Sequence, residues 1–165
     1  MEPGELLTRW TVRVALLGYV LALALCIRGQ ALPAARLAWT AGYLAFLIHV
    51  VCAFQYYHHW SHLDAYETTA QRTAQVAGFA WGGGLYLNYL FALLWGGDVL
   101  WWWLDPSGYS TRSRLIEWIL QGFLAFIALN ATLVFGVGTI RWLGLTGCLV
   151  LVGAALFRPK KQADR

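Results

Sequence analysis

The chain has 165 residues, of which 59% are hydrophobic and only 12% carry a charge. A soluble domain has roughly 25% charged residues and a disordered chain has low hydrophobicity, so this composition excludes both classes. The net charge of +4 comes from basic residues scattered along the chain rather than from a basic stripe, so we expect no nucleic-acid partner.

An all-α polytopic membrane bundle is the class that fits. Five apolar segments meet or approach the roughly 20 residues that a helix needs to cross a bilayer. In chain order they cover about residues 10–27, 37–57, 76–103, 115–136 and 139–157. The first is the weakest, because Arg13 leaves an uninterrupted run only over residues 14–27, a length that also suits a signal peptide. Since most connections are short, we expect residues 1–165 to form one integral membrane domain.

The basic residues indicate how this bundle is oriented, because Lys and Arg accumulate in cytoplasmic loops. With five spans and the C-terminus inside, the cytoplasmic side holds Arg28, Arg36, Arg112, Arg114, Arg158, Lys160, Lys161 and Arg165. The opposite side holds Arg9, Arg13, Arg72 and Arg141. Removing the first span would place the basic C-terminal cluster outside. We therefore predict a multi-pass protein of the inner membrane, with the N-terminus out and the C-terminus in.

Tryptophan is abundant, with ten residues in the chain. Most of them, Trp39 included, fall near predicted span ends, where an indole prefers the headgroup level of the bilayer. We interpret these residues as a membrane-interface belt. Trp81 and Trp95 are the exceptions, because they lie inside the third predicted span.

The histidines give the strongest functional signal, because all of them fall within fourteen positions. They are His49, His58, His59 and His62. If the second helix continues past residue 57, His58 and His62 form an i, i+4 pair on one side of it, with His59 nearby. Two imidazoles at this spacing can bind one metal ion, and His59, Asp64 or Glu67 would supply another ligand. The pattern predicts a transition-metal site, without choosing among zinc, iron, copper and nickel.

Two other interpretations of these histidines remain open. They lie beside Tyr56, Tyr57 and Trp60, so they can serve as further amphipathic anchors at the membrane surface. A proton-sensing role is the third interpretation, because histidine titrates near neutral pH.

His49 needs a separate explanation, because nine residues separate it from His58 and the two lie on opposite sides of a helix. An ionisable side chain inside a membrane faces the bundle interior by default. Haem ligation by His49 is a less favoured alternative, since no other span supplies a second histidine. A neutral histidine bonded to an asparagine or to a backbone carbonyl is the expected state.

A second candidate site is a ligand pocket at the same end of the bundle. Three consecutive glycines, residues 82–84, interrupt the third predicted span, and they mark either a close helix contact or a break that lines a cavity. Polar side chains follow directly. We predict an outward-facing pocket between the second and third spans, lined by His49, Tyr86, Asn88 and Tyr89.

Acidic residues mark the other end of the bundle. Asp98 and Glu117 lie toward the predicted cytoplasmic ends of their helices, with Arg112 and Arg114 close enough to pair with them. Structural pairing, or snorkelling of the side chains toward the headgroups, is the expected role of these groups.

No nucleotide-binding glycine loop, nucleophile elbow or zincin motif is present in the sequence. We expect a small inner-membrane protein whose histidine-lined pocket binds a metal ion or a small ligand. The main alternative is a non-catalytic accessory or structural subunit of a larger membrane complex. A metal-dependent membrane enzyme is a third class, and it would require a partner to complete its ligand set. The expected partners are the lipid bilayer, other membrane subunits or a second copy of the chain.

Overall fold

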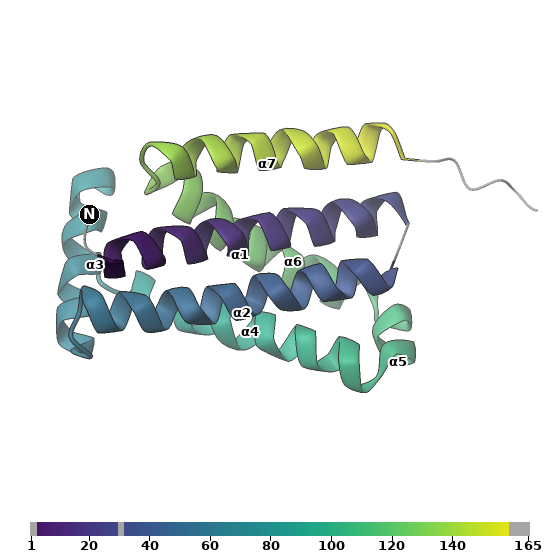
Figure 1. The fold of residues 1–165 in the computed structure, drawn as a ribbon, viewed down its shortest axis with the longest axis horizontal. Coiled ribbons are helices and arrows are strands. Elements are labelled where there is room, and N and C mark those ends of the chain that lie inside the picture. The colour runs from purple at the N-terminus through teal and green to yellow at the C-terminus, as the bar shows by residue number, and fades with distance from the viewer. Residues whose placement is uncertain (1–2, 30–31, 159–165) are drawn as a thin grey trace, which may run out of the picture.

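The computed structural model describes residues 3–29 and 32–158, and its regular elements are all helical. They are α1 (Pro3–Arg28), α2 (Leu32–Tyr56), α3 (His62–Ala77), α4 (Gly84–Leu104), α5 (Pro106–Thr111), α6 (Arg114–Leu129), the π-helical turn η1 (Asn130–Val134) and α7 (Thr139–Leu156). The long helices run side by side, α3 crosses one end of the bundle, and the short α5 lies at the other end (Figure 1). The expected all-α bundle is confirmed.

Four helical stretches in the described residues are long and apolar enough to cross a membrane. They are Pro3–Arg28, Leu32–Tyr56, Arg114–Val134 and Thr139–Leu156. Large apolar side chains point outward from them, and Leu149 on α7 is 71% exposed. Such surfaces suit contact with lipid rather than with water. α4 has 21 residues, a length that also suits a span at about 1.5 Å per residue, and it carries the polar side chains of Asn88 and Asp98.

The third predicted span differs from the structure at its start. Residues 76–103 do not form one helix, because α3 ends at Ala77 and α4 begins at Gly84. Gly78 closes α3 with a φ of +82°, a left-handed conformation that favours glycine. A Cβ atom on Gly82 would lie 2.6 Å from the Tyr66 ring, so this glycine lets the turn pack against α3. The glycine row therefore belongs to a turn between two helices.

An aromatic cluster forms the core where α1, α2 and α4 meet. Trp39 and Trp95 are each 2% exposed, and their ring centroids lie 5.0 Å apart. The prediction of Trp39 as a belt residue is wrong, because its indole N–H donates a hydrogen bond to buried Asp98. α1 and α2 approach closely, since a Cβ atom on Gly18 would lie 2.7 Å from the Cα atom of Gly42.

Candidate functional site

The connection between α2 and α3 determines where the predicted metal ligands lie. α2 ends at Tyr56, and His59 and Trp60 adopt φ values of +47° and +60°. The helix therefore does not continue past residue 57, as the predicted arrangement required. Ser61 starts a new helix, because its side chain accepts a hydrogen bond from the N–H of Asp64.

The histidines that follow α2 bond to separate partners. His58 Nδ1 lies 2.7 Å from Asp64 Oδ2, and His62 Nδ1 lies 3.1 Å from the hydroxyl oxygen of Tyr89 on α4. Within residues 3–29 and 32–158, no three His, Cys, Asp or Glu side chains gather so that they could hold a metal ion. The residues of the predicted metal set are not gathered in this structure, in which His58 and His62 meet different neighbours. That set is His58, His59, His62, Asp64 and Glu67.

The residues of the predicted ligand pocket do not converge, because His49 contacts α1 and the two tyrosines contact α3. His49 Nδ1 lies 3.0 Å from the carbonyl oxygen of Thr8, so it donates a hydrogen bond to α1. Tyr86 and Tyr89 pack against His62 of α3, with ring centroids 5.8 and 5.9 Å from its imidazole. Asn88 is exposed. A backbone carbonyl as the partner of half-buried His49 agrees with the expectation for a histidine inside a predicted span.

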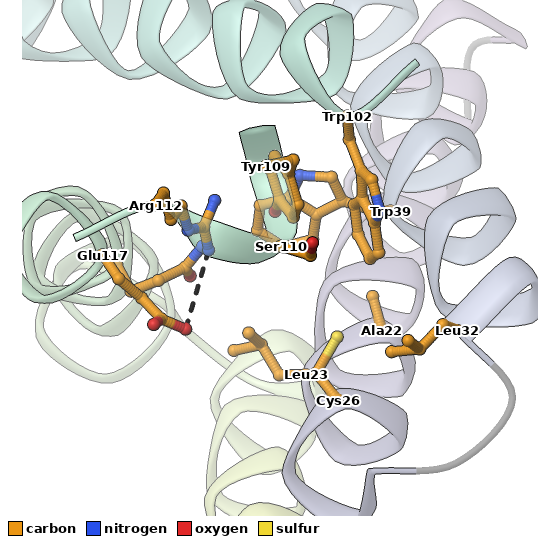
Figure 2. A pocket seen from close by; sticks show the side chains of 11 residues that line it. Ala22, Leu23, Cys26, Leu32, Trp39, Trp102, Tyr109, Ser110, Arg112 and Glu117 are labelled. Carbon is orange, nitrogen blue, oxygen red and sulfur yellow. Dashed lines mark ion pairs between the residues drawn. The ribbon is translucent and has the colours of Figure 1, made fainter. Parts of the chain in front are cut away.

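A cavity of about 290 Å³ lies at the opposite end of the bundle, beside α5 (Figure 2). It separates the α1–α2 pair from the start of α6, which packs on α4 rather than on α1. Its lining comprises Ala22, Leu23, Cys26, Leu32, Trp39, Trp102, Tyr109, Ser110, Arg112, Glu117 and Gln121. None of the four residues predicted to line a pocket belongs to this lining.

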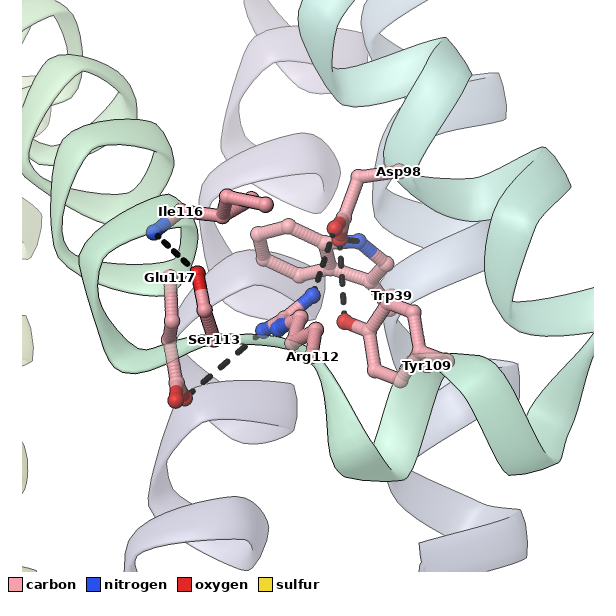
Figure 3. Close-up of polar contacts among 7 residues, drawn as sticks. All are labelled: Trp39, Asp98, Tyr109, Arg112, Ser113, Ile116 and Glu117. Atoms are coloured by element: carbon pink, nitrogen blue, oxygen red, sulfur yellow. Dashed lines mark hydrogen bonds and ion pairs between the residues drawn. The ribbon is translucent and has the colours of Figure 1, made fainter.

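A buried carboxylate organises one wall of this cavity (Figure 3). Asp98 accepts hydrogen bonds from Trp39 Nε1 at 2.9 Å, the Tyr109 hydroxyl at 3.0 Å and an Arg112 nitrogen at 2.8 Å. The side chains of Asp98 and Arg112 are 0% and 7% exposed. Arg112 also lies 3.6 Å from the carboxylate of Glu117. The expected pairing of the two acids with Arg112 is confirmed.

The short α5 presents Tyr109 to this cluster, and local chemistry explains its fold. Asp105 caps the helix, accepting hydrogen bonds from the Gly108 N–H at 2.9 Å and the Ser107 hydroxyl at 2.7 Å. These bonds hold the pKa of Asp105 below its ordinary value. Burial raises the pKa of the Tyr109 phenol, so the phenol stays protonated and donates to Asp98. The Tyr109 ring stacks on Trp102, with centroids 4.6 Å apart.

Several acceptor atoms in the cavity are left available to a ligand. Gln121 Oε1 is buried and has no hydrogen-bond partner in the described part of the chain. Ser110 donates its proton to the Ser107 carbonyl at 2.8 Å, which leaves its lone pairs available. The Glu117 side chain is 54% exposed and meets Arg112 only at 3.6 Å. The cavity thus presents acceptors beside aromatic walls.

The sequence interpretation assigned Asp98 a structural role and did not recognise this cavity. A usable signal was present, because an acid inside an apolar run marks a functional site by default. Gln121 carries no comparable signal, since a single amide in an amphipathic helix is ordinary.

Comparison with known proteins adds no assignment to this geometry. No protein-family model, no curated protein sequence and no solved structure matches the chain. The site is therefore characterised by its own contacts.

Proposed function

We propose that this protein is a small integral membrane protein that binds a lipid-soluble ligand in the cavity beside α5. One observation carries the proposal, namely the buried Gln121 Oε1, which no group in residues 3–29 and 32–158 satisfies. Buried polar atoms in proteins nearly always have a hydrogen-bond partner. A donor group of a bound ligand would satisfy this oxygen.

The inventory of polar groups supports a particular ligand class. The Tyr109 hydroxyl and an Arg112 nitrogen donate to Asp98, and Ser110 donates to the protein backbone. A ligand that donates from an O–H or N–H would therefore satisfy the buried Gln121 oxygen, which a ligand that only accepts cannot do. The aromatic walls favour a flat apolar body, and about 290 Å³ accommodates one or two rings.

The distribution of basic residues supports a position toward the cytoplasmic leaflet of an inner membrane. Arg28, Arg36, Arg112, Arg114 and Arg158 flank the helix ends at the α5 end of the bundle (Figure 1). Under the positive-inside rule this end faces the cytoplasm. The proposed site is thus opposite the end at which the histidines are found.

Cys26 offers a direct test, because it lines the cavity and is exposed. In a Cys52→Ala, Cys148→Ala background, the rate of Cys26 alkylation by a maleimide reports occupancy. The probes are 2-naphthol and 2-methoxynaphthalene, which share a shape but differ in the donor. We expect 2-naphthol to slow alkylation at a concentration about 5- to 10-fold lower than 2-methoxynaphthalene requires. This difference is the effect of one hydrogen bond to a buried acceptor.

Variants and a second reporter make the result specific. Gln121→Leu should remove the advantage of 2-naphthol, whereas Gln121→Glu should retain it because the carboxylate still accepts. Cys148 on α7, labelled in a Cys26→Ala, Cys52→Ala background, controls for partition of the probes into detergent. Equal protection by both probes would disprove the preference for a ligand that donates a hydrogen bond, but it would not disprove ligand binding in the cavity. If neither probe protects Cys26, the ligand-binding proposal is wrong, and co-purification of other subunits would test the accessory role.

A further inference from the structure

Two acceptor side chains of α6 line the cavity beside α5 from the same face of the helix. Glu117 and Gln121 are four residues apart, a spacing that brings helical side chains within about 5 to 6 Å of each other. The Gln121 Oε1 atom is buried without a partner in the described part of the chain, and the Glu117 side chain is 54% exposed. The cavity therefore offers a neutral acceptor and an anionic acceptor one helical turn apart.

The Glu117 carboxylate is only loosely paired. Arg112 and Glu117 are the charged residues among those that line the cavity. The Arg112 guanidinium bonds to buried Asp98 at 2.8 Å and lies 4.0 Å from the centroid of the Tyr109 ring. Its distance to the Glu117 carboxylate is 3.6 Å, which is too long for a hydrogen bond (Figure 2). Asp98 thus neutralises Arg112, and the negative charge of Glu117 is left for another cation.

The arginines that flank this end of the bundle are engaged or directed elsewhere. Arg36 donates a hydrogen bond to the backbone carbonyl of Trp102 at 3.3 Å, and its guanidinium lies 4.0 Å from the centroid of the Trp103 ring. Arg114 is exposed at the start of α6. Neither arginine belongs to the cavity lining. A cation inside the cavity would therefore meet Glu117 without competition from these two side chains.

We propose that the ligand of this cavity is a protonated aromatic amine, a proposal that rests on the ligand-binding function proposed above. An ammonium group has three N–H donors, and one nitrogen about 2.8 Å from each of two oxygens bridges a separation of up to about 5.6 Å. The ammonium group thus serves both Glu117 and Gln121, whereas a hydroxyl group donates only one proton. The indoles of Trp39 and Trp102 line the same cavity, and aromatic faces attract cations.

Isothermal titration calorimetry of the full chain in a neutral detergent tests the proposal with two probes of similar shape. The probe 2-naphthylmethylamine is a cation at neutral pH, whereas 2-naphthylmethanol is a neutral donor. We expect the amine to bind about 5- to 10-fold more tightly, because a hydrogen bond to a charged group is stronger than one between neutral groups. The advantage of the amine should shrink in about 1 M salt, because the half-exposed Glu117 carboxylate is then screened.

Three variants assign the effect to its residues. Glu117→Gln keeps the size of the side chain and an acceptor but removes the charge, so it should abolish the advantage of the amine and leave binding of the alcohol unchanged. Gln121→Leu should weaken the binding of both probes, because both donate to the buried oxygen. The matched control Glu67→Gln removes an exposed carboxylate from α3, at the opposite end of the bundle, and should leave both affinities unchanged (Figure 1).

The outcomes separate this proposal from the function on which it rests. An advantage of the amine that Glu117→Gln removes and Glu67→Gln retains supports the proposal. Equal affinities of the two probes for the wild type would overturn it and leave the ligand-binding function standing. An advantage that survives in Glu117→Gln would also overturn it, because the cation would then be held elsewhere. If neither probe binds the wild type, the ligand-binding function is wrong and the amine proposal with it.

Discussion

Removal of the buried carboxylate tests the polar cluster beside α5 most directly. In Asp98→Ala, the indole N–H of Trp39 and the hydroxyl of Tyr109 lose their acceptor. Arg112, whose side chain is only 7% exposed, also loses its buried counter-ion. The substitution thus leaves the buried Arg112 charge with only the half-exposed Glu117 carboxylate at 3.6 Å, and it leaves two polar groups without their acceptor.

The size of the effect follows from burial. Breaking a buried ion pair by removing one partner costs about 3 to 5 kcal/mol, because the other charge stays buried. For a chain of this size, about 1 kcal/mol lowers the unfolding midpoint by roughly 2 to 4 °C. We therefore expect Asp98→Ala to unfold about 6 to 20 °C below the wild type. Glu117→Ala removes the half-exposed partner of the same arginine and should cost at most about 1 kcal/mol.

Thermal unfolding in detergent, followed by circular dichroism, measures these differences. The double variant Asp98→Leu, Arg112→Met removes both charges and should unfold at a higher temperature than Asp98→Ala. Equal midpoints for Asp98→Ala and the wild type would refute the reasoning. So would a double variant that is no more stable than Asp98→Ala, because the loss of the buried counter-ion of Arg112 would then not be the cause.

Two further predictions concern helix packing and the cap of α5. Gly18→Leu should lower the unfolding midpoint, because its side chain would meet the backbone of Gly42 at 2.7 Å, whereas Gly153→Leu has nothing within 4 Å and should not. The lowered pKa of Asp105 means that its cap stabilises α5 fully above the ordinary pKa of about 4 and is lost as the pH falls through the lowered value. The amide proton resonance of Gly108 should therefore move below about pH 4 in the wild type and not in Asp105→Asn.

The helical bundle could be predicted because the sequence consists largely of apolar runs that are long enough to cross a membrane as helices. The turn between α2 and α3 was harder, because no glycine or proline separates Tyr56 from His62. Left-handed backbone at His59 and Trp60 makes the reversal instead. One local signal was available, since Ser61 and Asp64 have the spacing of a helix-capping motif. Recognising that motif would have placed His62 at the start of a new helix.

The ion pair of the candidate site was predictable, whereas its cavity was not. Asp98 and Arg112 flank a short polar connection, so sequence distance alone brings them to one end of the bundle. The cavity depends on which long helices pack together. α6 packs on α4 and leaves a space toward α1, and this arrangement is set by side-chain shapes rather than by hydropathy.

The proposed site lies where a buried polar atom has no hydrogen-bond partner, and not where the residues most often used as ligands are found. Histidines are the most versatile ligands in the sequence, yet His49 bonds to a backbone carbonyl and His58 to a neighbouring carboxylate. A group whose hydrogen bonds are already made gains little from a ligand, because binding must replace an existing partner. Gln121 is an ordinary residue whose buried oxygen has no partner in the described residues, so a donor that reaches it gains a hydrogen bond without displacing one.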